Sequence, residues 1–305
     1  MPRMDTVGEA YRWASSFLDK NGVESSLFEA ELLLRTALGW DRTRFFTEWD
    51  APLNRETFQR FREWVERRKQ GVPLQYLTGE QEFYGRTFRV NPSVLIPRPD
   101  TEVLVEAALK TMDQKGPTGR AVDIGTGSGA LAVTLAAEKP DWEWWALDRS
   151  SEALALARAN AEFHGMEEKI RWLQGDWLTP LMEREMMVDV IVSNPPYIPS
   201  ADIDGLERQV KDYEPRLALD GGEDGLDPYR RILEQVPDVL KCPGWIALEV
   251  GEGQGAAVAR LLHRLPGEVQ TSVIPDLAGR DRVVTGRVDD SPLTFGSAAI
   301  PHGGG

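Results

Sequence analysis

From residue 120 onward, short runs of β-branched and aromatic residues alternate with longer segments of helical periodicity, and this alternation restricts the fold more than any other feature. The runs expected to form strands are residues 121–124, 142–147, 170–174, 188–193, 245–250, 269–274 and 282–288. The segments expected to form helices are residues 130–138, 151–164, 229–239 and 255–265. This order is typical of α/β proteins, so we predict a doubly wound, mostly parallel sheet of seven strands.

A glycine-rich segment, DIGTGSG at residues 123–129, joins the first of these strands to the first helix. Glycine permits a tight turn and lets backbone approach a ligand closely, and the N-terminus of a helix favours negative charge. The spacing of Gly125, Gly127 and Gly129 differs from the Gly-x-Gly-x-x-Gly pattern that places a pyrophosphate on backbone amides. The segment therefore predicts a ligand site without identifying the ligand.

The next two strands end in residues that suit the other parts of an adenosine compound. Asp148 closes the second strand, 19 residues after Gly129, where a carboxylate can accept hydrogen bonds from both hydroxyls of a ribose. Asp176 and Trp177 follow the third strand and offer an acceptor for the exocyclic amine of adenine and a ring to lie against it. Each carboxylate alone is more often a cap or a surface charge, but the ordered set at successive strand ends predicts an adenosine site.

The fourth strand ends in the sequence NPPY at residues 194–197. Methylation of a planar nitrogen must contend with a lone pair that is delocalised into a π system, and acceptors placed at the N–H groups can hold that nitrogen in line with a methyl donor. The side-chain carbonyl of Asn194 and the backbone carbonyl of Pro195 can be those acceptors, while Tyr197 can stack on the planar group. The prolines, including Pro196, stiffen the loop. A plain proline turn would explain the prolines but not Asn194 and Tyr197.

The segments DIGTGSG, GDW at residues 175–177 and NPPYI at residues 194–198, together with Asp148, resemble those of class I S-adenosylmethionine-dependent methyltransferases that act on nitrogen. Three longer segments resemble the release factor glutamine methyltransferases in particular. They are LIPRPDTE at residues 95–102, EPRLALDGGEDGLDPYRRIL at residues 214–233 and DLAGRDRVV at residues 276–284. The resemblance extends from the helical N-terminus to about residue 288.

The resemblance implies a Rossmann-like catalytic fold, S-adenosyl-L-methionine as cofactor, and methylation of the glutamine in the Gly-Gly-Gln motif of class 1 peptide chain release factors. Carried over by position, the residues expected to bind the cofactor are Asp123, Gly125, Thr126, Gly127, Ser128, Gly129, Asp148, Asp176, Trp177 and Asn194. The residues expected to bind the substrate are Arg98, Asn194, Pro195, Pro196 and Tyr197, of which Asn194, Pro195 and Tyr197 are the catalytic candidates. Arg98 either orients the substrate or forms a salt bridge between domains.

The N-terminal quarter of the chain has helical periodicity throughout. We expect a helical domain at residues 1–78, a hairpin turning at Gly85 with a proline-rich bridge at residues 79–99, a catalytic domain at residues 100–288, and a disordered tail at residues 289–305. One predicted helix carries basic side chains at Arg60, Arg62, Arg67, Arg68 and Lys69. They are interpreted as a solvated face, or else as a docking surface for an acidic partner or for RNA-bound machinery. The resemblance implies that the helical domain docks the release factor.

A formal net charge of −14 argues against long-range attraction to nucleic acid or to an anionic membrane. The single cysteine, Cys242, excludes an internal disulfide and a zinc site of several thiolates, and we interpret it as a partly buried small residue. No metal site is expected, and the carboxylates at residues 220–227 are interpreted as local caps among turn glycines. No segment has the length of a signal peptide core or a membrane span, so we expect a cytoplasmic protein. We also expect a monomer.

Three other functions fit parts of the pattern. An adenine methyltransferase acting on DNA or RNA shares the NPPY geometry, but the acidic catalytic half argues against it. An enzyme that methylates a glutamine of a ribosomal protein is a second alternative. The features that distinguish it from a release factor glutamine methyltransferase are the LIPRPDTE bridge and the N-terminal helices. A non-catalytic sensor of an adenosine compound would have no reason to keep an intact NPPY.

Overall fold

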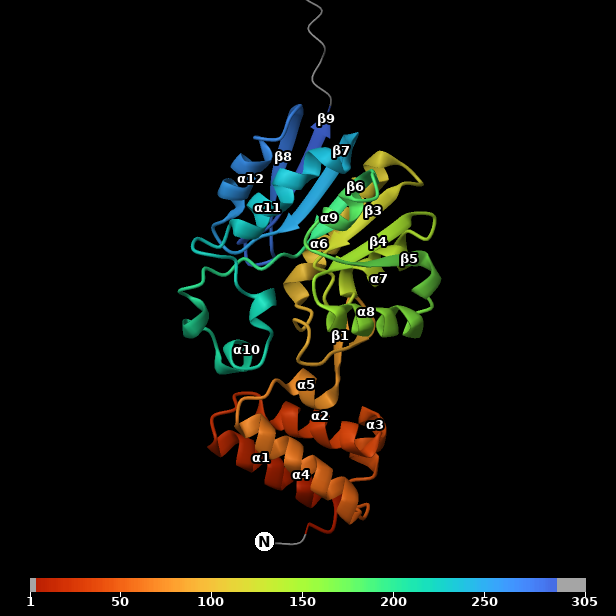
Figure 1. Ribbon diagram of the computed structural model, residues 1–305. Coiled ribbons are helices and arrows are strands. Elements are labelled where there is room, and N and C mark those ends of the chain that lie inside the picture. Colours follow the sequence, from red (N-terminus) through yellow and green to blue (C-terminus); the bar gives the residue numbers. More distant parts are fainter. Residues whose placement is uncertain (1–3, 290–305) are drawn as a thin grey trace, which may run out of the picture.

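The computed structural model describes residues 4–289, in which a group of helices lies at one end of the molecule and a seven-stranded sheet at the other (Figure 1). The expected tail lies outside the described residues, apart from its first residue, Asp289, which ends the last strand. The helices of the N-terminal group are α1 (Val7–Lys20), α2 (Ser26–Leu38), α3 (Arg42–Thr47), α4 (Arg55–Lys69) and α5 (Leu74–Thr78).

Three of the N-terminal helices, α1, α3 and α4, begin next to a capping side chain. The side chains of Thr6, Asp41 and Asn54 each accept a hydrogen bond from the backbone N–H three residues further along, which satisfies one free donor of α1, α3 and α4. The apolar faces of these helices meet in a core of their own, separate from that of the sheet, whose fully buried members include Leu18, Leu33, Leu34, Phe45 and Phe61. The helical periodicity predicted from the sequence is therefore satisfied inside this group.

A short hairpin and a proline-rich segment lead from the helices to the sheet. The hairpin consists of β1 (Glu80–Phe83) and β2 (Arg86–Arg89), and the backbone turns through Tyr84 and Gly85, both with positive φ, as a two-residue turn requires. The side chains of Phe83 and Phe88 are buried in the core of the sheet. The segment then enters a 3-10 turn, η1 (Pro99–Thr101), and α6 (Glu102–Lys115), close to the expected start near Asp100.

The sheet has the order β5-β4-β3-β6-β7-β9-β8. Its strands are β3 (Arg120–Ile124), β4 (Glu143–Asp148), β5 (Ile170–Gln174), β6 (Val188–Ser193), β7 (Leu240–Glu249), β8 (Glu268–Pro275) and β9 (Asp281–Asp289). β3 to β7 are parallel, whereas β9 pairs antiparallel with β7 and β8. The predicted seven-stranded, mostly parallel sheet is confirmed, and its strand order reverses between β3 and β6, where open α/β sheets bind ligands.

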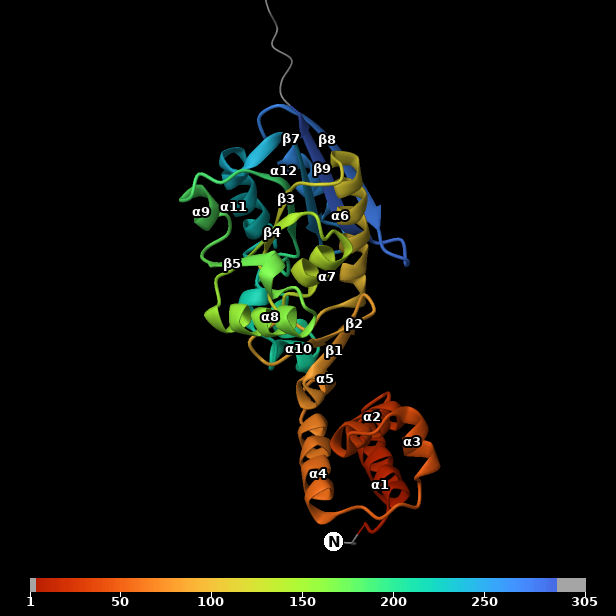
Figure 2. The same cartoon turned by 90° about the vertical axis from the view of Figure 1, so that its right-hand side faces the viewer.

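Helices cover both faces of the sheet (Figure 2). The longer ones are α6, α7 (Ala130–Glu138), α8 (Ser151–Phe163), α11 (Asp227–Gln235) and α12 (Gly255–Leu262). The shorter ones are α9 (Thr179–Met182), α10 (Arg208–Lys211), η2 (Glu167–Lys169), η3 (Ile203–Gly205), η4 (Arg216–Ala218) and η5 (Val236–Asp238). One core lies between the sheet and α6 and α7, and a second lies between the sheet and α11 and α12, as a doubly wound fold requires.

Most elements lie within one residue of their expected bounds, and three differ by more: β7, the helix predicted at residues 229–239, and the helix predicted at residues 255–265, which ends at Leu262. β7 begins at Leu240, five residues before the predicted strand, because the chain stays extended through the cis Cys242–Pro243 bond, with a shift of register on β6 between Val188 and Val190. Cys242 is consequently exposed, which corrects its interpretation as a partly buried residue. The predicted helix 229–239 begins earlier, at Asp227, and passes into η5 at Val236, beside Pro237, because proline cannot continue an α-helix.

Candidate active site

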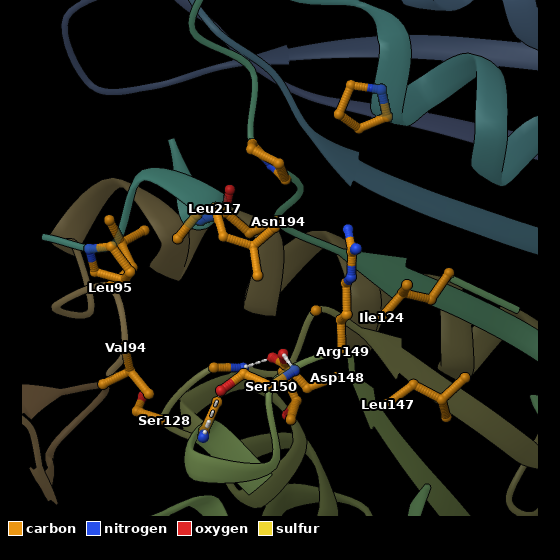
Figure 3. Close-up of a pocket in the computed structure, with 18 of the residues that line it drawn as sticks. Val94, Leu95, Ile124, Ser128, Leu147, Asp148, Arg149, Ser150, Asn194 and Leu217 are labelled. Carbon is orange, nitrogen blue, oxygen red and sulfur yellow. Dashed lines mark hydrogen bonds between the residues drawn. The ribbon is translucent and has the colours of Figure 1, made fainter. Parts of the chain in front are cut away.

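A cavity of about 580 Å³ lies at the carboxyl ends of β3, β4, β5 and β6, beside the point where the strand order reverses. Its wall includes most of the residues predicted for the site, namely Arg98, Gly125, Thr126, Gly127, Ser128, Asp148, Asp176, Trp177, Asn194 and Pro196. Figure 3 shows Asn194 and Leu217 across the cavity from Asp148 and Ser150, with Val94 and Leu95 of the proline-rich segment along one side. The structure thus brings segments from both halves of the sheet and from the bridge to one cavity.

The glycine-rich loop adopts a conformation that side chains rarely tolerate. Gly125, Gly127 and Gly129 have φ values of 71°, 55° and 81°, and a Cβ atom on Gly129 would lie 3.0 Å from the Cβ of Ala157 on α8. The N–H groups of Gly125 and Thr126 both donate to the carbonyl oxygen of Leu147, so that the loop is tied to the end of β4. Loop backbone, rather than side chains, therefore forms this wall of the cavity.

Asp123 lies beneath the loop and does not line the cavity. Its carboxylate is fully buried, and the hydroxyl of Thr126 donates to its Oδ2 at 2.7 Å. Burial raises the pKa of Asp123 to about 7. Its Oδ1 is buried and has no hydrogen-bond partner among residues 4–289. Asp123 thus supports the loop and leaves one unpaired acceptor directly under the predicted cofactor site.

Asp148 projects into the cavity from the end of β4 (Figure 3). Its Oδ2 accepts from the N–H of Gly127 at 2.8 Å and its Oδ1 accepts from the N–H of Ser150 at 2.9 Å. Burial raises the pKa of Asp148, and these backbone donors act in the opposite direction. Each carboxylate oxygen has two lone pairs, so each can accept one further hydrogen bond from a ligand hydroxyl.

Asp176 and Trp177 line the cavity after the end of β5, as predicted. Trp177 has a positive φ of 51°, and its side chain also packs against the core on the α11 side of the sheet. A Cβ atom on the preceding Gly175 would lie 2.3 Å from Pro180, so the chain can turn here only without a side chain. Trp177 belongs to the cavity wall, where a planar ring can lie against an indole.

Asn194 begins the segment that follows β6. Its Nδ2 donates to the hydroxyl of Thr101 at 3.1 Å, and Thr101 belongs to η1, 93 residues earlier in the sequence. No described residue donates a hydrogen bond to Asn194 Oδ1 or to the carbonyl oxygen of Pro195. Pro195 is itself buried and does not line the cavity with its ring, whereas Pro196 does. Two neighbouring acceptors at the end of β6 therefore lack a described protein donor, and of the two residues only Asn194 lines the cavity.

Tyr197 does not line the cavity. Its ring lies close to Gly251 and packs with the core residues on the α11 side of the sheet, and its side chain lowers the pKa of the nearby Glu249 carboxylate. Burial raises the pKa of Tyr197 to about 12. Its backbone carbonyl accepts from Gln254 Nε2 at 2.9 Å. In this structure the residue anchors the segment after β6 to β7, and the predicted stacking on a substrate stays a prediction.

Arg98 lines the cavity and forms an ion pair with Glu214, with 2.6 Å between Arg98 Nη2 and Glu214 Oε1. The Glu214 side chain is 1% exposed, so the carboxylate of this ion pair is buried. This contact joins the proline-rich segment to the polypeptide that follows β6. Arg98 thus has a structural partner and also belongs to the wall of the cavity.

The carboxylates around residue 220 act as turn and cap groups. Asp220 accepts from the hydroxyl of Ser200 at 2.5 Å and from the N–H of Gly222 at 3.1 Å. Asp224 accepts from the N–H of Leu226 and pairs with Arg230. Within residues 4–289, no three His, Cys, Asp or Glu side chains are grouped in a way that could hold a metal ion.

Some residues at the site were not predicted. Thr101 and Leu217 line the cavity, and Glu249 lies behind it at the end of β7. Asn160 of α8 joins the glycine-rich loop to the hairpin. A charged residue that ends an otherwise apolar run, as Glu249 does after residues 245–248, is a sequence signal that could have identified it.

A doubly wound sheet whose last strand inserts antiparallel beside β7, with a glycine loop after β3 and NPPY after β6, defines a class I methyltransferase. Solved structures share this fold. The catalytic domain of hMettl16 in complex with MAT2A 3'UTR hairpin 6 superposes with a TM-score of 0.54 at 15% identity, over 76% of this chain and 83% of that one. A methyltransferase from Pyrococcus furiosus superposes with a TM-score of 0.50 at 19% identity, over 68% and 91%.

Sequence comparison identifies the family. Residues 9–79 match the PrmC N-terminal domain and residues 100–221 match the methyltransferase small domain. The release factor glutamine methyltransferase of Geobacter sulfurreducens is 44% identical over 94% of this chain and 98% of its own length. That of Bacillus subtilis is 41% identical over 92% and 97%. The chain belongs to the release factor glutamine methyltransferase family, which confirms the resemblance of its motifs.

None of the helices in the described part of the chain has the length and apolar character of a membrane span.

Proposed function

We propose that this protein transfers a methyl group from S-adenosyl-L-methionine to the side-chain amide nitrogen of the glutamine in the Gly-Gly-Gln motif of class 1 peptide chain release factors. The observation that carries the proposal is the pair of acceptors without a described protein donor, Asn194 Oδ1 and the Pro195 carbonyl oxygen beside it in the chain, of which Asn194 belongs to the wall of a cavity suited to an adenosine compound. Membership of the family supports the same activity.

The cavity fits S-adenosylmethionine on three counts. Gly125 lines the cavity, and a Cβ atom on it would meet no protein atom within 4 Å, so a ligand can approach the loop backbone there. Asp148 keeps a free lone pair on each oxygen for the ribose hydroxyls. Trp177 provides an aromatic surface at the rim. The cofactor supplies an electrophilic methyl group on a sulfonium centre.

The substrate amide is held by the segment after β6. A primary amide has two N–H donors, and the two acceptors at Asn194 and Pro195 match that number. Holding both N–H groups fixes the plane of the amide and aims its nitrogen at the cofactor, so that positioning supplies most of the rate enhancement. Leu95 and Leu217 line the same cavity and offer apolar surface for the methylene groups of a glutamine side chain.

The helical region at residues 1–78 serves as the docking domain for the release factor. Its surface carries two neighbouring exposed apolar side chains, Leu27 and Phe28, which are 63% and 56% exposed. We propose that the protein acts as a cytoplasmic monomer without binding nucleic acid directly, in keeping with its formal net charge of −14.

Transfer of a labelled methyl group from S-adenosylmethionine tests the proposal. The acceptors are a purified class 1 release factor, its Gly-Gly-Gln→Gly-Gly-Ala variant, a ribosomal protein with a methylatable glutamine, DNA and RNA. Label on the intact factor alone supports the proposal. Label on nucleic acid would overturn it, and label on the ribosomal protein would keep the chemistry but change the partner.

A further inference from the structure

Glu249, the last residue of β7, is a buried carboxylate placed directly behind the substrate end of the cavity. β7 pairs in parallel with β6 in a register that sets Leu248 opposite Ser193. The next residue of each chain segment, Glu249 and Asn194, therefore lies at the same level of the sheet. The residue is only 1% exposed, and its Oε2 has no hydrogen-bond partner among residues 4–289. Burying a carboxylate is costly unless it is well paired, so its position calls for an explanation.

The hydroxyl of Thr101 connects this carboxylate to Asn194. Thr101 is 5% exposed, its hydroxyl oxygen accepts from Asn194 Nδ2 at 3.1 Å, and its side chain lies near the Glu249 carboxylate, whose pKa it lowers. The Tyr197 side chain acts on the pKa of the same carboxylate in the same direction. Three segments, namely η1, the start of the segment after β6 and the end of β7, thus meet in one buried polar network.

The chemistry of these groups gives the network a direction. An ionised carboxylate can only accept hydrogen bonds, and a hydroxyl has one hydrogen to donate. When Thr101 donates that hydrogen to Glu249, its oxygen can only accept from Asn194. The Asn194 amide must then present its NH₂ group to Thr101 and its carbonyl oxygen to the substrate.

We propose that Glu249 is a positioning residue that acts through Thr101 to hold the carbonyl oxygen of Asn194 toward the substrate amide. The inference rests on the proposed function only for the identity of the substrate, because the orientation of Asn194 is a property of the protein alone. Without the network, the amide could rotate by half a turn and present two donors to a substrate that itself donates.

The ionisation of Glu249 controls which groups of this network donate hydrogen bonds and which accept them. Burial raises the pKa of Glu249 to about 7, and the Thr101 side chain and the nearby Arg282 act against that rise. The charged and titratable groups that face it are Arg282 on β9, Asp100 in η1, Tyr197 after β6 and Tyr229 on α11, whose hydroxyl donates to the Glu249 backbone carbonyl. A protonated Glu249 can donate to Thr101, and the direction is then no longer fixed.

The first test needs no methyl acceptor. The side-chain ¹⁵N–¹H signals of Asn194, assigned by their loss in Asn194→Ala, are followed by NMR between pH 5.5 and about pH 8.5. We expect them to move with a midpoint near the pKa of Glu249, and to stop responding in Glu249→Gln and in Thr101→Val. Signals that do not respond to pH in the unmodified protein, or that respond equally in both variants, would overturn the inference and leave the proposed function standing.

Kinetics provide the second test. Thr101→Val removes the hydroxyl with little change of shape, and we expect kcat to fall at least about tenfold while the Kd for S-adenosylmethionine stays within about twofold. Thr101→Ser keeps the hydroxyl and should retain most of the activity. The double variant Thr101→Val/Glu249→Gln should lose little more than either single variant, because the two residues act through one chain of contacts.

A matched control is Asp189→Asn, which replaces another buried carboxylate, near the start of β6 and paired with Lys241. If this control lowers kcat as much as Glu249→Gln does, the effect on turnover is one of general stability and the positioning role is wrong. If the unmodified protein methylates no release factor but the NMR response is present, the proposed function fails and the inference holds.

Discussion

Asn160 donates a hydrogen bond from its side chain to the carbonyl oxygen of Ser128 at 2.8 Å, and so ties α8 to the glycine-rich loop. The same side chain donates to the carbonyl oxygen of Arg89 at 3.0 Å and accepts from the N–H of Arg89 at 2.8 Å. Asn160 is fully buried. One amide therefore connects the hairpin, which leads from the helical region, to the loop that lines the cavity.

Asn160→Ala is expected to destabilise the protein and to weaken cofactor binding together. The change leaves buried groups of Arg89 and Ser128 without partners, and we expect a loss of about 2–4 kcal/mol in the free energy of unfolding. Chemical denaturation and calorimetric titration with S-adenosylmethionine measure the two effects. Asn91→Ala, which removes an exposed side chain that accepts from Ser93, is the control and should change neither quantity strongly.

Gly129→Ala and Gly165→Ala separate backbone strain from crowding. Both positions have positive φ, 81° and 69°, so both substitutions incur a strain of roughly 1–2 kcal/mol. Only at Gly129 does the new methyl group meet a neighbour, Ala157 at 3.0 Å. We expect Gly129→Ala to be the more destabilising by about 1–3 kcal/mol and to weaken S-adenosylmethionine binding, while Gly165→Ala leaves binding unchanged. Equal binding by both variants would show that the shape of the loop does not limit the cofactor.

The sequence predicts the strands of the sheet well because each is an apolar run bounded by breaking residues. The predicted bounds of β5 and β6 coincide with the observed strands. The start of β7 could not be predicted, because Pro243 and Gly244 ordinarily mark a turn, and here neighbouring strands keep them extended. Local preference indicated a turn, and pairing with β6 and β9 overrides it.

In the candidate active site, too, contacts between distant parts of the chain could not be predicted from local sequence. Asp148, Asp176 and Asn194 follow predicted strands, so their meeting at one sheet edge could be inferred from their order in the chain. The contact between Thr101 and Asn194 joins residues 93 positions apart, and it depends on how η1 packs against the ends of β6 and β7. The direction of the Tyr197 ring depends on the space beside Gly251, which no local pattern reveals.

Asp123 is expected to make stability depend on pH. Its pKa is about 7 in the folded protein because of burial, whereas an aspartate in an unfolded chain titrates near pH 4. Between these values the folded state holds a proton that the unfolded chain has released, so the free energy of unfolding falls as pH rises, by up to about 1.4 kcal/mol per pH unit. Below this window the contribution is fully present, and above pH 7 it is lost.

Asp123→Asn tests this assignment, because asparagine keeps the acceptor for Thr126 and does not titrate. Urea denaturation at pH 5, 6, 7 and 8 should give a shallower decline for the variant than for the unmodified protein. Some decline should remain, because Glu249 also has a raised pKa. Parallel curves for the two proteins would mean that Asp123 is ionised in the folded state throughout this range.

Asn194→Ala should abolish turnover and leave the cofactor in place. The change removes one of two acceptors for the substrate amide, and we expect kcat to fall by at least about a hundredfold, as for the loss of an aligned group in the transition state. The Kd for S-adenosylmethionine should change by less than about threefold if most of the cofactor contacts lie at the glycine loop and Asp148. Full activity in the variant would contradict the assigned role, and joint loss of binding and turnover would place Asn194 mainly in the cofactor site.

The helical region should matter for a whole release factor and not for a short peptide. Leu27 and Phe28 lie at the start of α2, one residue before Glu29, whose ion pair with Arg68 holds α2 to α4. Leu27→Asp/Phe28→Asp places charge on the proposed docking surface without removing a core contact, because both side chains are exposed. We expect KM for intact release factor to rise about tenfold, as for the loss of apolar anchors at an interface, with kcat unchanged.

The rate with a peptide that carries Gly-Gly-Gln should be the same for this double variant and the unmodified protein, because a peptide reaches only the cavity. Leu277→Asp is the control, since Leu277 is fully exposed on the turn between β8 and β9, outside the helical region. If the double variant keeps its KM for the intact factor, docking uses another surface. If it loses activity with the peptide as well, the helical region affects the catalytic half through the contacts of α5 and the hairpin, and docking is not its sole role.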